Sequence, residues 1–258
     1  MKKDSAQGRP LLVGGDNRSA PLGGPGGWAA LKALDVASIE PVLRQRLADA
    51  WARDALFEHA SVASFSRFSL HLLAVAAPPE LVDAAHQAAI DEVKHARLCF
   101  ALASAYAGEP LGPGPLPLEG DILGALDLPS IAVAAVREGC VGETLASLEA
   151  ATAHEVATVD AAREALAVIT EDEARHAELA WKFVRWTLDV GGPAVREAVA
   201  AAFAEALAAP RPPLAPEDPL DAALAAHGRL SDRRKQASMT EGLIEVVRPA
   251  ADALLAAR

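Results

Sequence analysis

Cysteine is scarce in this sequence, with Cys99 and Cys140 as the two thiols in 258 residues. Two cysteines cannot supply a disulfide framework or a zinc site made of four thiolates. We expect both to be small buried core residues and not disulfide partners, because they should lie on opposite sides of the functional layer described below.

Aromatic residues are also few, at 4%, although 52% of the chain is hydrophobic. Much of this hydrophobic fraction is alanine, the strongest helix former, and runs of β-branched residues are rare. The composition therefore predicts an all-α fold.

The sequence also lacks long apolar runs and an excess of basic residues. It has no stretch of about 18 uninterrupted apolar residues, so we expect no transmembrane helix and no membrane partner. No apolar run of signal-peptide length follows Met1–Asp4, which predicts a cytoplasmic protein. The net charge of -11 disfavours nucleic acid as a partner, because phosphate contacts need clustered Lys and Arg.

Proline and glycine divide the chain into three parts. Residues 1–37 are rich in both and predict an irregular N-terminal arm, residues 38–190 predict four helices, and residues 191–258 predict a helical C-terminal extension. The expected helix boundaries are about 38–77, 80–106, 130–154 and 159–190, followed by 194–209 and a last helix at 237–257 that is kinked or broken at Pro249. Ser38 and Ser130 are the expected N-caps of the first and third helices.

The lengths of the connections predict how the four helices pack. Short turns join the first helix to the second and the third to the fourth, so each pair should form an antiparallel hairpin. Between the pairs lies a Pro- and Gly-rich connection of roughly twenty residues, 108–129. It can run the length of the molecule and make the second and third helices parallel, an arrangement with one long crossover.

Two pentapeptides share the pattern Asp-Glu-x-basic-His, at 91–95 and 172–176. Within each, the Glu and the His are three residues apart, so both project from one face of a helix. That face is otherwise apolar and packs into the core. An unpaired charge is costly to bury, and a divalent metal is the simplest common partner for four such groups. The predicted ligands are Glu92, His95, Glu173 and His176.

A two-metal site in such an arrangement needs one further carboxylate from each of the other two helices. Glu58 is the sole acid on the apolar stripe of the first helix. On the third helix Glu143 lies in the middle of the stripe and is preferred, while Glu138, off the stripe, remains the alternative. Glu58 precedes Glu92 by 34 residues, and the equivalent spacing in the second half is 30, which gives the site a two-fold pseudo-symmetry.

These motifs, over about residues 45–190, resemble the ferritin-like di-metal carboxylate families, which include bacterioferritin, rubrerythrin and the bacterial di-iron hydroxylases. The resemblance implies a ferritin-like four-helix bundle with one long crossover. It also implies that Glu92 and Glu173 bridge two metals, and that Glu58 and Glu143 bind one metal each. Residues 1–40 and 191–258 match no element of these families.

The resemblance further implies a set of groups around the ligands. In these families an acid accepts the outer N–H of each ligand histidine, which fixes its tautomer. Here that role falls to Asp91 and Asp172, with Lys94 and Arg175 as partners of the two acids. No catalytic residue beyond the metal ligands is predicted.

Four carboxylates and two neutral imidazoles balance two divalent ions, and hard oxygen ligands favour iron, or manganese, over copper and zinc. We therefore expect a di-iron oxidoreductase that activates O₂ and hydroxylates or oxidises an unidentified organic substrate. The sequence has no rubredoxin-type Cys-x-x-Cys, so the electron donor must be external, and a homodimer is one option for the assembly. Two alternatives remain open: iron oxidation, iron storage or di-manganese peroxide disposal on the one hand, and a non-catalytic helical scaffold on the other.

Overall fold

The computed structural model describes residues 8–23, 27–29 and 34–256. Helix accounts for 71% of the structure and strand for 3%, so the predicted all-α class is confirmed. None of the helices in these ranges is long and apolar enough to cross a membrane.

Four long helical segments form the main body of the molecule, here called the helical body. They are α1 (Pro41–Ala74), α2 (Pro79–Ala107), the continuous run α3 (Leu128–Ala134), η1 (Ala135–Glu143) and α4 (Thr144–Val156), and α5 (Asp160–Val190). η1 is a π-helical segment, with one extra residue in its hydrogen-bonded turn, and such segments often mark functional sites.

The caps of two helices differ from the expected ones. Glu40, and not Ser38, caps α1: its carboxylate accepts the Leu43 N–H at 3.0 Å. Asp127, and not Ser130, caps α3, with its carboxylate accepting the Ser130 N–H at 3.0 Å. In both cases an acid precedes a proline at the first or second helical position, where the missing proline N–H would have no helical partner.

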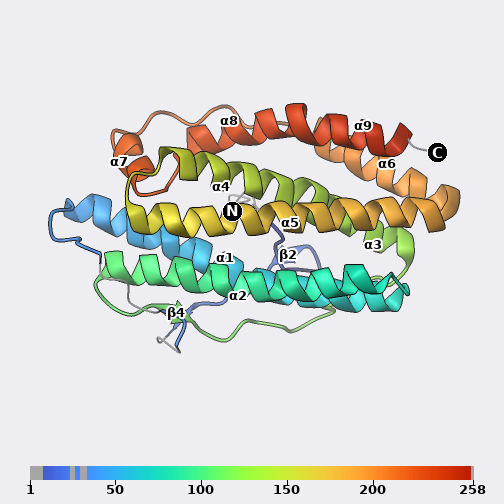
Figure 1. The fold of residues 1–258 in the computed structure, drawn as a ribbon, viewed down its shortest axis with the longest axis horizontal. Helices are drawn as coiled ribbons and strands as arrows, with labels where there is room; N and C mark the ends of the chain where they lie inside the picture. The colour runs from blue at the N-terminus through green and yellow to red at the C-terminus, as the bar shows by residue number, and fades with distance from the viewer. Residues whose placement is uncertain (1–7, 24–26, 30–33, 257–258) are drawn as a thin grey trace.

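The helical body consists of two antiparallel pairs, α1 with α2 and α3–η1–α4 with α5, and α2 packs against α5 between the pairs. The connection 108–127 runs along the length of α2, so that α2 and α3–η1–α4 point the same way (Figure 1). Assignment of this arrangement to the ferritin-like fold remains a prediction.

The apolar core is divided in two. One cluster contains Phe65, Phe68 and Phe183, and the other contains Trp51 and Phe100. On α1, α2 and α5 the two clusters occupy opposite halves of the same buried stripe. The residues between them are buried and polar, so the helical body carries a polar layer across its middle.

The N-terminal segment differs from the expected irregular arm. β1 (Leu12–Val13) pairs antiparallel with β2 (Asp16–Asn17), and β3 (Leu22–Gly23) pairs with β4 (Gly112–Pro113) of the connection. Residues 8–11 are buried against the helical body. The Ser61 and Ser64 hydroxyls of α1 donate to the carbonyl oxygens of residues 9 and 10, at 3.0 and 3.2 Å, and thereby satisfy backbone groups that burial removes from water. The rest of the predicted arm lies partly outside the described residues.

The C-terminal part consists of α6 (Gly192–Ala208), α7 (Asp221–Ala226), α8 (Asp232–Gly242), the π-helical η2 (Leu243–Val247) and α9 (Arg248–Ala256). α8 packs against α4, and α6 packs against α3 and η1 (Figure 1). The last helical run begins at Asp232, five residues before the expected start, and passes Pro249 without a break. The π-helical turns of η2 end two residues before the proline, which is the second residue of α9. The division into three domains remains a prediction.

We predict that replacing Gly142 by alanine will dislodge the N-terminal segment. A Cβ atom at this position would lie 2.5 Å from the Gly8 carbonyl oxygen, closer than any real contact. The expected loss is about 1–3 kcal/mol in the free energy of unfolding, together with faster hydrogen exchange at residues 8–12. Ser147→Ala, one turn further along and adding no atoms, is the control. Unchanged exchange in Gly142→Ala would contradict this packing.

Candidate metal centre

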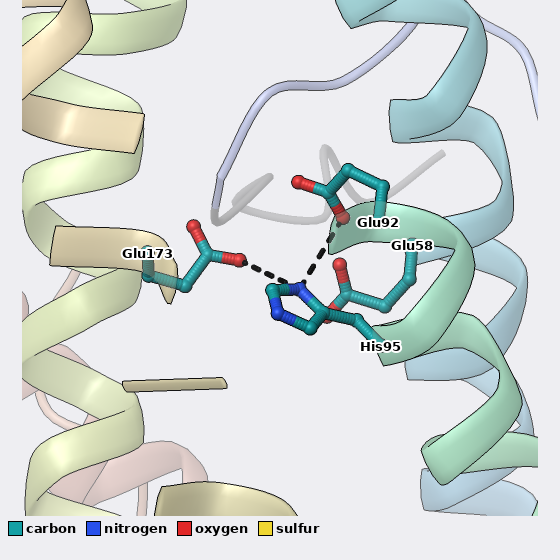
Figure 2. Close-up of side chains that lie close together, drawn as sticks. All are labelled: Glu58, Glu92, His95 and Glu173. Carbon is teal, nitrogen blue, oxygen red and sulfur yellow. Dashed lines mark ion pairs between the residues drawn. The ribbon is translucent and has the colours of Figure 1, made fainter. Parts of the chain in front are cut away.

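The polar layer brings all six predicted ligands together. They form two groups that share Glu173, and within each group the candidate ligand atoms lie within 4.8 Å of one another. The first group is Glu58, Glu92, His95 and Glu173; the second is Glu143, Glu173 and His176. Figure 2 shows the first group, with Glu173 reaching across from α5 toward His95 on α2. The helices thus place carboxylates and imidazoles around a common space.

The two glutamates of the doubled motif face both histidines. Glu92 places one oxygen 3.6 Å from His95 Nδ1 and the other 3.3 Å from His176 Nδ1. Glu173 does the same, with one oxygen 3.5 Å from His95 Nδ1 and the other 3.6 Å from His176 Nδ1. Most of these separations are too long for good hydrogen bonds, so the atoms surround a space and do not pair directly. Each carboxylate therefore spans the two halves of the site.

The outer nitrogen of each histidine faces the aspartate of the other motif. His95 Nε2 donates to Asp172 at 3.1 Å, and His176 Nε2 lies 3.6 Å from Asp91. With the proton on Nε2, the Nδ1 lone pair of each ring points at the glutamates, as metal binding requires. Each motif on α2 and α5 thus provides an aspartate that faces the histidine of the other motif.

Two exposed cations neutralise these aspartates. Lys94 Nζ lies 3.4 Å from Asp172. Arg175 pairs with Asp172 and also lies 3.6 Å from Asp91. Burial would raise the pKa of Asp172, but the His95 hydrogen bond and the nearby charges outweigh it and lower that pKa to about 2. Asp172 therefore remains an anion that can hold the His95 ring.

Several buried polar atoms in the layer have no hydrogen-bond partner. They include Oε2 of Glu92, both carboxylate oxygens of Glu143, Oε2 of Glu173 and the Nδ1 atoms of His95 and His176. All five residues are at most 3% exposed. Unpaired buried polar groups are rare and costly, and these are anionic or lone-pair donors that converge. The donor set therefore fits metal ions.

The protonation of the metal-free site follows from burial. Burial raises the pKa of Glu58 well above its usual range, and the charges of Glu92 and Glu173 raise it further. Burial and then the charge of Glu173 do the same for Glu143. For His95, burial lowers the pKa, but the surrounding carboxylates outweigh it and raise the pKa above its usual value. Divalent ions must therefore displace protons from this site when they bind.

Glu138, the alternative to Glu143, faces elsewhere. The Arg67 Nη2 group donates to both of its oxygens, at 3.0 and 3.1 Å, and Arg9 Nη1 lies 3.6 Å away. Glu143 points into the layer and belongs to the second group of candidate ligands. The structure therefore brings Glu143, and not Glu138, to the other five predicted ligands.

Arg9 is a component of this region that the sequence did not reveal. Its side chain is 2% exposed, its Nε lies 3.7 Å from Glu143, and its guanidinium lies over the Phe65 and Phe68 rings, at 4.8 and 4.3 Å from their centroids. A single arginine within a Gly- and Pro-rich segment carries no periodic signal. Only the fold brings it to a helix that begins more than a hundred residues later.

A cavity of about 450 Å³ borders the layer on one side. Glu58, Glu92 and Glu173 form part of its wall, and Glu58 is partly exposed because it faces this space. Cys99 also lines it, whereas Cys140 belongs to the other core cluster. Both thiols are buried and free, as predicted.

Comparison of the chain with protein-family models, with curated proteins and with solved structures gives no match. The site is thus defined by its own geometry, as a buried carboxylate–histidine cluster that could hold metal ions.

We predict that Glu143→Gln will lose metal and Glu138→Gln will not. After anaerobic loading with Fe(II) and removal of the excess, elemental analysis should give about two ions per chain for the wild type and for Glu138→Gln, and about one for Glu143→Gln. The reason is that only Glu143 points its carboxylate into the layer. The opposite pattern would assign the ligand to Glu138.

Proposed function

We propose that this protein is a ferritin-like di-iron oxidoreductase that reacts with O₂ and hydroxylates or oxidises an organic substrate. The observation that carries the proposal is the position of Glu92 and Glu173, each with one carboxylate oxygen facing each of the two histidines. A carboxylate that serves two imidazole-bearing positions at once is the arrangement expected of a ligand shared by two metal ions.

The fold supports the same class. Two antiparallel helix pairs joined by one long crossover are typical of ferritin-like proteins, in which each helix contributes inward-facing ligands. Here α1 and the η1 segment contribute one glutamate each, and α2 and α5 contribute a Glu-x-x-His motif each. The ligand pattern and the helix connectivity are separate observations, and both support the ferritin-like class.

The donor set favours iron or manganese. Four of the six candidate ligands are carboxylates, and none is a thiolate. The four negative charges balance two divalent ions, so that burial of the loaded site carries no net charge. Glu58, Glu92, His95, Glu143, Glu173 and His176 would hold two iron ions, which would provide two electrons for the reduction of O₂.

The surrounding residues determine geometry and access. The Asp172 carboxylate accepts a hydrogen bond from the outer nitrogen of His95, and the Asp91 carboxylate lies 3.6 Å from the outer nitrogen of His176. Both positions favour rings whose inner lone pairs face the ligand space. Arg9 lies beside Glu143 and over the rings of Phe65 and Phe68, and Glu143 itself is inaccessible to solvent. The Glu58 side remains open to the cavity.

The cavity favours an organic substrate over iron as the substrate. A space of about 450 Å³ next to the ligands is large enough for an organic molecule, since small-molecule sites are typically about 300–1,000 Å³. Iron oxidation requires only a narrow path for ions. Residues of the C-terminal segment 228–235 form part of the cavity wall, which gives this extension a role in substrate binding.

We predict that the Fe(II)-loaded protein will consume O₂ and that Glu92→Gln/His95→Gln will not. The reason is that the double variant removes one shared carboxylate and one imidazole from the same half of the site. O₂ uptake by anaerobically loaded protein should be about one molecule per pair of irons. Circular dichroism shows whether the variant keeps its helical content.

The same measurement separates the alternatives. Continued oxidation of excess Fe(II), with many irons retained per chain as mineral, would contradict the oxidoreductase proposal and indicate iron storage. Peroxide breakdown by manganese-loaded protein, without O₂ uptake by the iron form, would indicate peroxide disposal. If the folded wild type binds no metal and consumes no O₂, the scaffold alternative is correct.

A further inference from the structure

The cavity beside the ligands extends away from the site toward the C-terminal segment. Glu58, Glu92 and Glu173 form one part of its wall, and five residues of the C-terminal segment form another: Gly228, Arg229, Leu230, Asp232 and Lys235. A second cavity, of about 280 Å³, shares Arg229, Lys235 and three neighbouring residues with the first. The two spaces meet at this shared wall, which is therefore a natural place to hold one end of a molecule that reaches the ligands with the other.

Part of the cavity wall is apolar. α1 contributes Trp51 and Phe57, and α5 contributes Leu166 and Ile169. Cys99 lies among them, and burial raises the pKa of its thiol well above the usual value, so it stays neutral. An apolar portion of a bound molecule would be favoured here, because it removes hydrocarbon surface from water.

The charges on the rest of the wall are mostly positive. Apart from the metal ligands, five cationic side chains line the cavity and three acidic ones do: Arg9, Arg18, Arg53, Arg229 and Lys235 against Asp54, Glu149 and Asp232. The chain as a whole carries a net charge of -11, so this surplus is local and of opposite sign. Once metal ions balance the ligand carboxylates, the cavity would attract anions.

Arg229 is the best-placed of these cations. Its side chain is 8% exposed, its guanidinium lies 4.7 Å from the centroid of the Trp51 ring, and it pairs with Asp54. Its Nε atom is buried without a hydrogen-bond partner. Gly228 allows the preceding turn: its φ is +77°, and a Cβ there would lie 2.8 Å from Leu166. The guanidinium is therefore held rigidly at the cavity, with donors that Asp54 does not use.

Lys235 provides a second cation on the same wall. Its Nζ pairs with Glu149 at 2.9 Å. Burial raises the pKa of Glu149, which Lys235 only partly offsets, and Oε2 of Glu149 has no partner. Lys235 contacts one Glu149 oxygen, and its ammonium group has further N–H donors for a ligand.

We propose that this cavity binds a small amphipathic organic anion. Its carboxylate or phosphate group lies against Arg229 and Lys235, and its apolar part extends past Trp51 and Ile169 toward Glu58. A planar guanidinium suits either head group, because both accept paired hydrogen bonds. That this anion is a substrate rests on the proposed function. Its binding does not, because binding requires no O₂.

Calorimetric titration of the metal-loaded protein, without O₂, with octanoate, octyl phosphate and octan-1-ol tests this. We expect at least one of the two anions to bind about tenfold or more tightly than the alcohol, because a charged head group gains hydrogen bonds that the alcohol lacks. The tighter of the two anions identifies the head group. Equal binding of the alcohol and both anions would overturn the proposal.

Variants separate this site from direct binding at the metals. Asp54→Asn/Arg229→Gln removes both members of the partly buried pair without changing the net charge. Lys235→Gln is a milder change, and it tests the site if the first variant does not fold. Each variant should weaken binding of the preferred anion by about tenfold and leave the binding of octan-1-ol unchanged.

The matched control is Lys182→Gln. Lys182 is an exposed lysine of α5 that pairs with Glu178, and this variant should bind the anion as the wild type does. Undiminished anion binding by both cavity variants would place the anion elsewhere. Because no step involves O₂, failure here is distinct from failure of the oxidoreductase proposal.

Discussion

The structure depends on one constraint, the burial of four glutamate side chains between two apolar clusters. Glu92, Glu143 and Glu173 are nearly inaccessible, and Glu58 is accessible only in part, from the side where the cavity lies. Such a layer is stable only if positive charge enters it, as protons in the metal-free protein or as divalent ions in the loaded one. The helices position the four carboxylates. The protons or metal ions that neutralise them allow the two apolar clusters to pack on either side of the layer.

The two-fold pseudo-symmetry of the ligands does not extend to their surroundings. On the Glu143 side, Gly8 and Arg9 pack against the π-helical η1 segment. On the Glu58 side there is the cavity, and residues of both the N-terminal and the C-terminal segments form part of its wall. Both extensions therefore contact the same centre. This asymmetry supports a site that handles a molecule on one side only.

Much of the site could be predicted from the sequence because its signals are local. The doubled motif places Glu and His on one face of a helix, and Glu58 is the sole acid on its apolar stripe. The choice between Glu143 and Glu138 depended on the same periodicity, and the structure directs Glu138 to Arg67. What could not be predicted depends on contacts between distant segments: which of the two histidines each aspartate faces, and the insertion of Arg9 beside Glu143. No periodic pattern records such contacts, and a Gly- and Pro-rich segment gives no sign of where it packs.

The most direct test of the central claim is anomalous X-ray scattering at the iron edge, from crystals of protein loaded anaerobically with Fe(II). The account predicts a pair of anomalous peaks per chain. One should lie among Glu58, Glu92, His95 and Glu173, and the other among Glu143, Glu173 and His176, with Glu92 and Glu173 in contact with both. A single peak bound by one motif, or no peak within the polar layer, would contradict it.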